Sequence, residues 1–178
     1  ILGDIYYNTS GYDSALICYQ MSLISLIKDF SDTDIYANPK KVYNPDAISQ
    51  YDILYKKANA FRQKFQENSN LEFLKAAFEI YNLIDELNDH SRNSKMADVS
   101  LLMINELFRA EYENGIDCGY QLYAKTGDIS YLNDTYTLME KGKYMLFFKS
   151  LSLVEKVDNV DLPINLKSIE DSLKSQYS

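Results

Sequence analysis

The sequence predicts an all-α fold in which helix-turn-helix units stack into a solenoid. Apolar residues recur at three- and four-residue steps throughout, and no run alternates apolar and polar residues as a half-buried strand does. The chain has only 6 glycines and 3 prolines among 178 residues, and most of them lie between the periodic segments. One segment also repeats an earlier one in register, which is typical of units that bury their apolar faces against a neighbour.

The first unit is expected at about residues 1–30, followed by a polar, proline-bearing connection. Asn44 suits an N-cap and Pro45 suits the first helical position, so a helix of about 20 residues is predicted to begin there. Its apolar stripe consists of Tyr51, Leu54, Tyr55, Ala58, Phe61, Arg62 and Phe65.

A second helix completes a unit at about residues 45–90. Ser69 and Glu72 have the spacing of a capping box, and the polar segment HSRNS marks the end of the helix. Its predicted apolar face consists of Leu74, Ala77, Phe78, Tyr81, Ile84 and Leu87.

The third unit is expected at about residues 94–156. A helix of about 30 residues is predicted to end at the T-G-D turn, and a further helix runs from about Ile129 to Val154. Residues 1–156 therefore form the predicted array, and residues 157–178 are expected to be a linker and a short C-terminal helix.

The internal repeat has a constant shift of 58 residues, the separation of Phe65 from Tyr123. The potential cap residues Asn70 and Asp128 coincide under this shift. The coinciding apolar pairs are Phe65 with Tyr123, Leu71 with Ile129, Phe73 with Tyr131, Leu74 with Leu132, Phe78 with Tyr136, and Ile80 with Leu138.

The opening stretch resembles a tetratricopeptide repeat. Leu2-Gly3-x-x-Tyr6, followed by Ala15 and Tyr19, matches the L-G-x2-Y … A-x3-F pattern of that family. The resemblance implies that the two small residues let the helices approach closely, while the two tyrosines fill the space beside them. The family's tryptophan position precedes the first residue, so we expect the chain to begin inside a repeat of a longer array.

A second resemblance comes from the elements Leu122-Tyr123, Thr126-Gly127-Asp128, Tyr131-Leu132, Glu140-Lys141-Gly142-Lys143 and Leu162-Pro163. This succession, within about residues 65–175, is similar to the end of the tetratricopeptide array that precedes the caspase-like peptidase domain in bacterial CHAT proteins. The resemblance implies a regulatory or partner-binding role. It places the family's catalytic histidine and cysteine after Ser178, so neither His90 nor Cys118 inherits a catalytic role.

Charge and composition exclude several functions. A net charge of −8 and a pI near 4.7 oppose binding to nucleic acid or to an anionic bilayer. The longest weakly charged run, YMLFFKSLSLV, is too short to span a membrane, so a cytoplasmic location is expected. With 2 cysteines and 1 histidine, we expect no metal site, no cofactor and no catalysis.

The predicted binding surface is the concave face of the solenoid, which the first helices of the units line. Its partner is expected to be a protein, a peptide or an adjacent domain of the same chain. The candidate residues are Asp4, Tyr7 and Asn8 in the first unit, Asn59, Gln63 and Gln66 in the second, and Asp117, Gln121 and Lys125 in the third.

Two other functions stay open. The array suits the sensor part of a bacterial signalling regulator, in which a membrane helix or a DNA-binding module follows. A small-molecule binder or enzyme requires a closed pocket with convergent titratable groups, and no spacing in the sequence indicates one. The carboxylates Glu106, Glu111 and Glu113 fall on different faces of one predicted helix and are interpreted as solvated.

Overall fold

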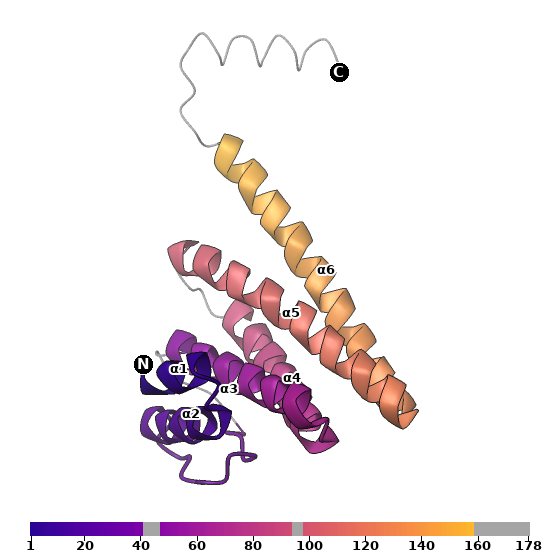
Figure 1. Cartoon of the computed structure of the whole chain (residues 1–178). Helices are drawn as coiled ribbons and strands as arrows, with labels where there is room; N and C mark the ends of the chain where they lie inside the picture. The colour runs from indigo at the N-terminus through magenta and orange to yellow at the C-terminus, as the bar shows by residue number, and fades with distance from the viewer. Residues whose placement is uncertain (41–46, 94–97, 159–178) are drawn as a thin grey trace, which may run out of the picture. The chain divides into compact units, whose positions relative to one another are not determined.

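The computed structural model describes residues 1–40, 47–93 and 98–158, and the side chains within 1–40, 49–86 and 110–143. The regular secondary structure in these ranges is helical throughout, which confirms the prediction of an all-α fold (Figure 1). The helices are α1 (Leu2–Asn8), α2 (Tyr12–Leu26), α3 (Ala47–Asn68), α4 (Leu71–Asn93), α5 (Asp98–Thr126) and α6 (Ile129–Asp158).

The chain divides into two compact units, Ile1–Gly142 and Lys143–Ser178, with the boundary inside α6. All contacts discussed below lie in the first of these units. None of the helices, over the residues that are described, is long and apolar enough to cross a bilayer.

Within residues 1–142, helices consecutive in the sequence pack against one another from α1 to α5, and α3 also touches α5. The contact between α1 and α2 is close because Gly3 has no side chain: an added Cβ there would lie 2.6 Å from Cε1 of Tyr19. Ala15 is fully buried, as the pattern predicted. Tyr6 does not follow the prediction, because its ring is 38% exposed and packs beside Gly11.

The core runs between α3 and α4. Most of the predicted stripe of α3 is buried, and Phe61 stacks with Phe73 of α4 at 6.2 Å between ring centroids. Tyr55 and Arg62 are exceptions, since both are only partly buried. Within residues 71–86 the buried side chains of α4 are Leu74, Ala76, Ala77, Phe78, Ile80, Tyr81, Ile84 and Asp85, and Leu87 of the predicted face lies outside the described side chains.

The turn between α3 and α4 begins with a left-handed residue. Ser69 has φ of 56°, and its N–H donates to the carbonyl of Phe65 at 2.7 Å. This is the single-bond αL cap that ends many helices. The next helix is then capped by Asn70, whose Oδ1 accepts from the N–H of Glu72 at 3.1 Å.

The turn between α5 and α6 repeats these contacts one shift later. Gly127 has φ of 72°, and its N–H donates to the carbonyl of Tyr123 at 2.8 Å. Asp128 Oδ1 accepts from the N–H of Ser130 at 2.9 Å. The repeat therefore extends from the sequence to the backbone conformation and hydrogen bonds of the turns.

One boundary prediction is wrong and another is confirmed. Ser69 is not the N-cap, because its left-handed backbone ends α3 and leaves the capping role to its neighbour Asn70. The segment HSRNS does mark the end of the second helix, since α4 ends within it at Asn93. The predicted start at Asn44 and Pro45 and the C-terminal linker helix lie outside the described residues.

The repeat is less regular in side-chain burial. Phe65 is 7% exposed, whereas its counterpart Tyr123 is half-buried. Phe78 is 3% exposed, whereas Tyr136 is 62% exposed. The difference arises because α5 covers Phe78, whereas no described helix lies over Tyr136.

Candidate functional site

The nine predicted binding residues lie on α1, α3 and α5, the first helices of the three helix pairs. We call this set the first-helix face: Asp4, Tyr7, Asn8, Asn59, Gln63, Gln66, Asp117, Gln121 and Lys125. It consists of residues whose side chains are all described, and none of them is fully buried.

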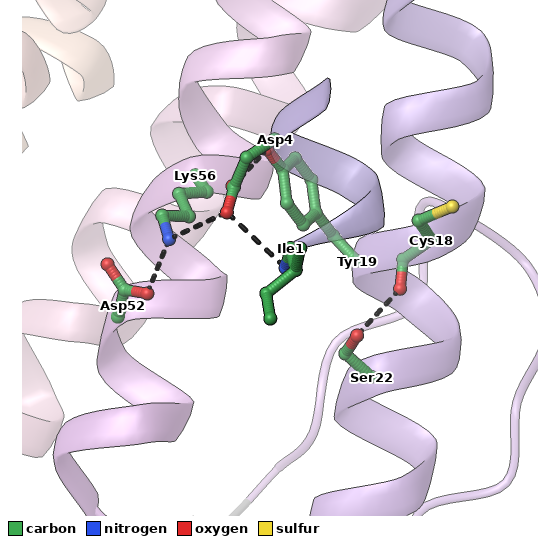
Figure 2. Close-up of polar contacts among 7 residues, drawn as sticks. All are labelled: Ile1, Asp4, Cys18, Tyr19, Ser22, Asp52 and Lys56. Atoms are coloured by element: carbon green, nitrogen blue, oxygen red, sulfur yellow. Dashed lines mark hydrogen bonds and ion pairs between the residues drawn. The ribbon is translucent and has the colours of Figure 1, made fainter. Parts of the chain in front are cut away.

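Asp4 joins α1 to both neighbouring helices. It accepts a hydrogen bond from the Tyr19 hydroxyl of α2 at 3.0 Å, and Lys56 of α3 approaches its other oxygen at 3.4 Å. Lys56 also pairs with Asp52 at 2.7 Å, so it lies between two carboxylates (Figure 2). The Cys18 thiol points away from this cluster. Asp4 therefore holds three helices together as well as contributing to the surface.

Tyr7 links α1 to the middle of α3. Its ring meets the edge of Tyr12 with centroids 5.5 Å apart, and the Gln63 side chain of α3 lies beside its hydroxyl. Burial raises the pKa of Tyr7, and the nearby Gln63 side chain opposes that rise. The phenol is therefore neutral at physiological pH and acts as a hydrogen-bonding group.

Asn59 lies at the centre of a polar cluster between α3 and α5. Its Oδ1 accepts from the Tyr81 hydroxyl at 2.9 Å and from Nδ2 of Asn114 at 3.3 Å. Asn114 also donates to the Tyr55 hydroxyl at 3.2 Å. Burial raises the pKa of Tyr81 well above its usual value, so the hydroxyl stays protonated as a donor.

An ion pair and a cation–π contact continue the junction of α3 and α5 toward the turns. Arg62 Nη2 lies 2.9 Å from Oδ2 of Asp117, and Gln121 donates to the same oxygen at 2.9 Å. Lys125 Nζ lies 5.5 Å from the centroid of the Phe65 ring. Asp117 and Lys125 of α5 therefore lie opposite Arg62 and Phe65 of α3.

The structure therefore brings most of the predicted residues together and shows which of them contact one another. Asp4, Asn59, Asp117 and Gln121 each form a side-chain hydrogen bond within the chain, and their binding of a partner stays a prediction. Asn8, Gln66 and Lys125 are exposed near the C-terminal ends of α1, α3 and α5.

Sequence reasoning missed Lys56, Arg62, Tyr55 and Asn114. Arg62 was assigned to the apolar stripe because it falls at a three- or four-residue step from Ala58 and Phe65. A signal was present, because Tyr55, Asn59, Arg62 and Gln66 have helical spacing of their own and define a polar face.

The two thiols differ in burial. Burial raises the pKa of Cys118 to about 12 although the Arg62 charge acts in the opposite direction, so the fully buried thiol stays protonated near neutral pH. Cys18 is half-buried and unbridged. His90 lies outside the described side chains, and the described residues contain no cluster of three metal-binding groups.

Two open cavities lie in the N-terminal part of the chain, and the first of them includes Asp4 of the first-helix face in its wall. One of about 550 Å³ is bordered by α1, α2 and the start of α3, with Ile17, Met21 and Ile53 in its wall. The other, of about 690 Å³, lies beside the segment between α2 and α3, at Phe30, Pro39 and Gln50.

The comparisons with known proteins returned no match: no protein-family model, curated protein or solved structure is similar to this chain. The functional argument therefore rests on the repeated turns and on the first-helix face.

Proposed function

We propose that residues 1–142 form a tetratricopeptide-like module that binds an extended protein segment along the first-helix face. The observation that carries the proposal is the pair of matching turns after α3 and α5. Ser69 and Gly127 share the left-handed conformation, and each donates to the equivalent carbonyl. Two turns of one geometry support a similar arrangement within the two helix pairs, which stacked repeats require.

Small residues at helix contacts support the proposal. Gly3 meets the Tyr19 ring, as the tetratricopeptide pattern requires, and Gly119 of α5 occupies a similarly crowded position. An added Cβ at Gly119 would lie 2.7 Å from the Phe78 ring of α4. Close helix packing of this kind brings first helices side by side, as the bonds between α3 and α5 indicate.

The chemistry of the face suits a peptide backbone. Amide side chains offer donors and acceptors together, and Gln63 and Gln121 are only partly buried. The charge of Arg62 is matched by Asp117, so the centre of the face is close to neutral. Exposed Lys125 adds a positive charge at one end, which favours a segment with an acidic residue at that position.

The wider setting follows from the sequence resemblance. A module of this type, placed before a caspase-like peptidase, recognises a partner or restrains the attached domain and carries out no catalysis of its own. The alternative is the sensor array of a bacterial signalling regulator. Both roles use the same face, so a binding experiment tests what they share.

The test is selection of extended peptides from a displayed library against the intact chain, followed by affinity measurements. We expect the double variant Gln63→Ala, Gln121→Ala to weaken binding of the selected peptides by ~10-fold or more, which is about 1.4 kcal/mol. The matched control is Glu79→Ala, Thr137→Ala, a pair on α4 and α6 related by the same repeat shift. The proposal fails if no peptide is selected, or if the glutamine variant binds as tightly as the control.

A further inference from the structure

The outer side of α6 exposes large apolar side chains. Ile129 is 58% exposed, Tyr136 is 62% exposed and Met139 is 40% exposed. They lie at helical spacing on one side of α6, and we call them the α6 outer face. The other side of α6 is occupied, because Thr135 and Leu138 are buried and lie closest to Gly119 and Gly115 of α5.

The same positions one repeat earlier form a helix interface. The repeat shift relates Ile129, Tyr136 and Met139 to Leu71, Phe78 and Tyr81 of α4. Phe78 is 3% exposed and Tyr81 is fully buried. The α6 outer face is therefore equivalent to a surface that is covered elsewhere in the same molecule.

The helix that covers α4 has a distinct chemistry. α5 presents Gly115 and Gly119, one turn apart, to α4 and α6. An added Cβ at Gly115 would lie 3.2 Å from Cβ of Tyr81, and one at Gly119 would lie 2.7 Å from the Phe78 ring. Phe78 and Tyr81 of α4 thus pack directly against the backbone of α5, which is accessible there because Gly115 and Gly119 have no side chains.

Large apolar residues are exposed on α1 and α2, at Leu2, Ile5, Ile17 and Met21, and again on α5 and α6. Across the described side chains of α3 and α4, no large apolar residue is more than about a third exposed, in contrast to the α6 outer face. On α5, Tyr120 is 60% exposed. Its counterpart under the shift is Arg62, which reaches the following helix pair at Asp117. Equivalent positions are covered on the middle helix pair and open on the last one.

We propose that the α6 outer face binds an amphipathic helix that presents two small residues four positions apart, as α5 does to α4. The surface continues, one repeat on, the established interface between α4 and α5. This inference rests on the repeat geometry and goes beyond the proposed binding of peptides on the first-helix face, because the two surfaces have no residue in common. The binding contributed by the partner helix comes from close packing of its backbone on Tyr136 and Met139.

The probe is a fluorescent peptide with the sequence of residues 110–126, which contains Gly115 and Gly119. Its binding to the intact chain is measured by fluorescence anisotropy under reducing conditions and moderate salt, which screens the acidic charges of both molecules. Circular dichroism follows the helix that the isolated peptide gains on binding, since so short a helix is marginal in water.

We expect saturable binding by the wild-type chain and a loss of ~10-fold or more in affinity for Tyr136→Asp and for Met139→Asp. Ile17→Asp is the matched control, because Ile17 of α2 is also exposed, at 57%, but lies outside the α6 outer face. A peptide carrying Gly115→Leu and Gly119→Leu should lose binding to the wild-type chain.

Three outcomes overturn the inference: absence of binding, equal binding by Tyr136→Asp and wild type, or retained binding by the leucine peptide. If the peptide instead displaced α5 of the chain, the Tyr136→Asp variant would bind it as tightly as wild type does, and this result would contradict the inference. Failure here leaves the first-helix face untouched, since Gln63→Ala and Gln121→Ala should not alter this affinity.

Discussion

At the scale of single residues, Lys57 is the most constrained charged group described in the chain. It is fully buried, and its Nζ lies 2.7 Å from Gln20 Oε1, 2.8 Å from the carbonyl of Ala37 and 2.9 Å from Asn38 Oδ1. These bonds tie α3 to α2 and to the segment that follows α2. Burial lowers the pKa of Lys57 to about 7, against the opposing influence of nearby aspartates.

This pKa predicts how stability depends on pH. An unfolded lysine titrates near 10.4, so between about pH 7 and pH 10 the unfolded chain binds more protons at Lys57 than the folded chain. The free energy of unfolding should therefore rise with pH across this window. Urea unfolding of wild type and Lys57→Met checks it, because the variant lacks this titration. A wild-type advantage that stays constant or falls as pH rises contradicts the assignment.

Phe65 and Tyr123 occupy equivalent sequence positions but should respond differently to truncation. Phe65→Ala removes a ring that is 7% exposed and should cost about 3–5 kcal/mol of unfolding free energy. Tyr123→Ala removes a half-buried ring and should cost clearly less. The comparison uses thermal or urea unfolding, with Gln66→Ala as an exposed control expected to change stability by about 0.5 kcal/mol or less. Equal losses at both aromatic positions would show that exposure in the structure does not govern their contribution.

Residue roles were the hardest feature to predict from the sequence. Spacing alone placed Arg62 on an apolar stripe, because a helical period does not separate a buried ring from a long side chain whose head reaches past the core. Its partner Asp117 is far away in the sequence, so their pairing depends on how α3 meets α5. The face of each helix was predictable, but the pairing of groups across helices was not.

At the scale of elements, a residue in the left-handed conformation recurs at the turn within each helix pair. Ser10, Ser69 and Gly127 have φ of 60°, 56° and 72° at the three helix-to-helix turns. A residue with a Cβ pays a conformational cost of about 1–2 kcal/mol in this region, whereas glycine adopts it freely.

The turns therefore predict a reciprocal pair of substitutions. Ser69→Gly should raise the free energy of unfolding and Gly127→Ser should lower it, each by about 1 kcal/mol, and Ser10→Gly should act in the same direction as Ser69→Gly. No atom lies within 4 Å of a Cβ added at Gly127, so the loss there reports backbone strain and no clash. Unfolding midpoints measure all three changes. Opposite signs at Ser69 and Ser10 would show that the turns are not equivalent.

The starts of α4 and α6 were predictable from the sequence because Asn and Asp are favoured helix N-caps. The shift that pairs Asn70 with Asp128 located both helix starts correctly. Ser69 was misassigned because serine suits an N-cap in isolation, and only the path of the chain out of α3 selects its left-handed conformation. The polar run HSRNS located the end of α4, at Asn93, although it contains no glycine or proline.

At the scale of the whole chain, periodicity predicted the helical fold, because burial of one stripe per helix is a strong constraint on sequence. It did not predict the exposure of Tyr136, whose pattern matches that of buried Phe78. Sequence periodicity marks a surface as suitable for burial, and whether another helix covers it depends on neighbours. Periodicity likewise placed the residues of the predicted binding face on α1, α3 and α5, but it did not predict the hydrogen bonds that some of them form.

The most direct measurement of the proposed function is the NMR footprint of a selected peptide on the ¹⁵N-labelled chain. Binding along the first-helix face predicts that the largest amide shift changes fall on α1, α3 and α5, around Gln63, Gln121 and Lys125, with small changes on α2 and α4. The same spectra recorded with Gln63→Ala, Gln121→Ala should show weaker changes at equal peptide concentration. Shift changes concentrated on the outward side of α2 or α4, with α3 and α5 unaffected, would contradict the account.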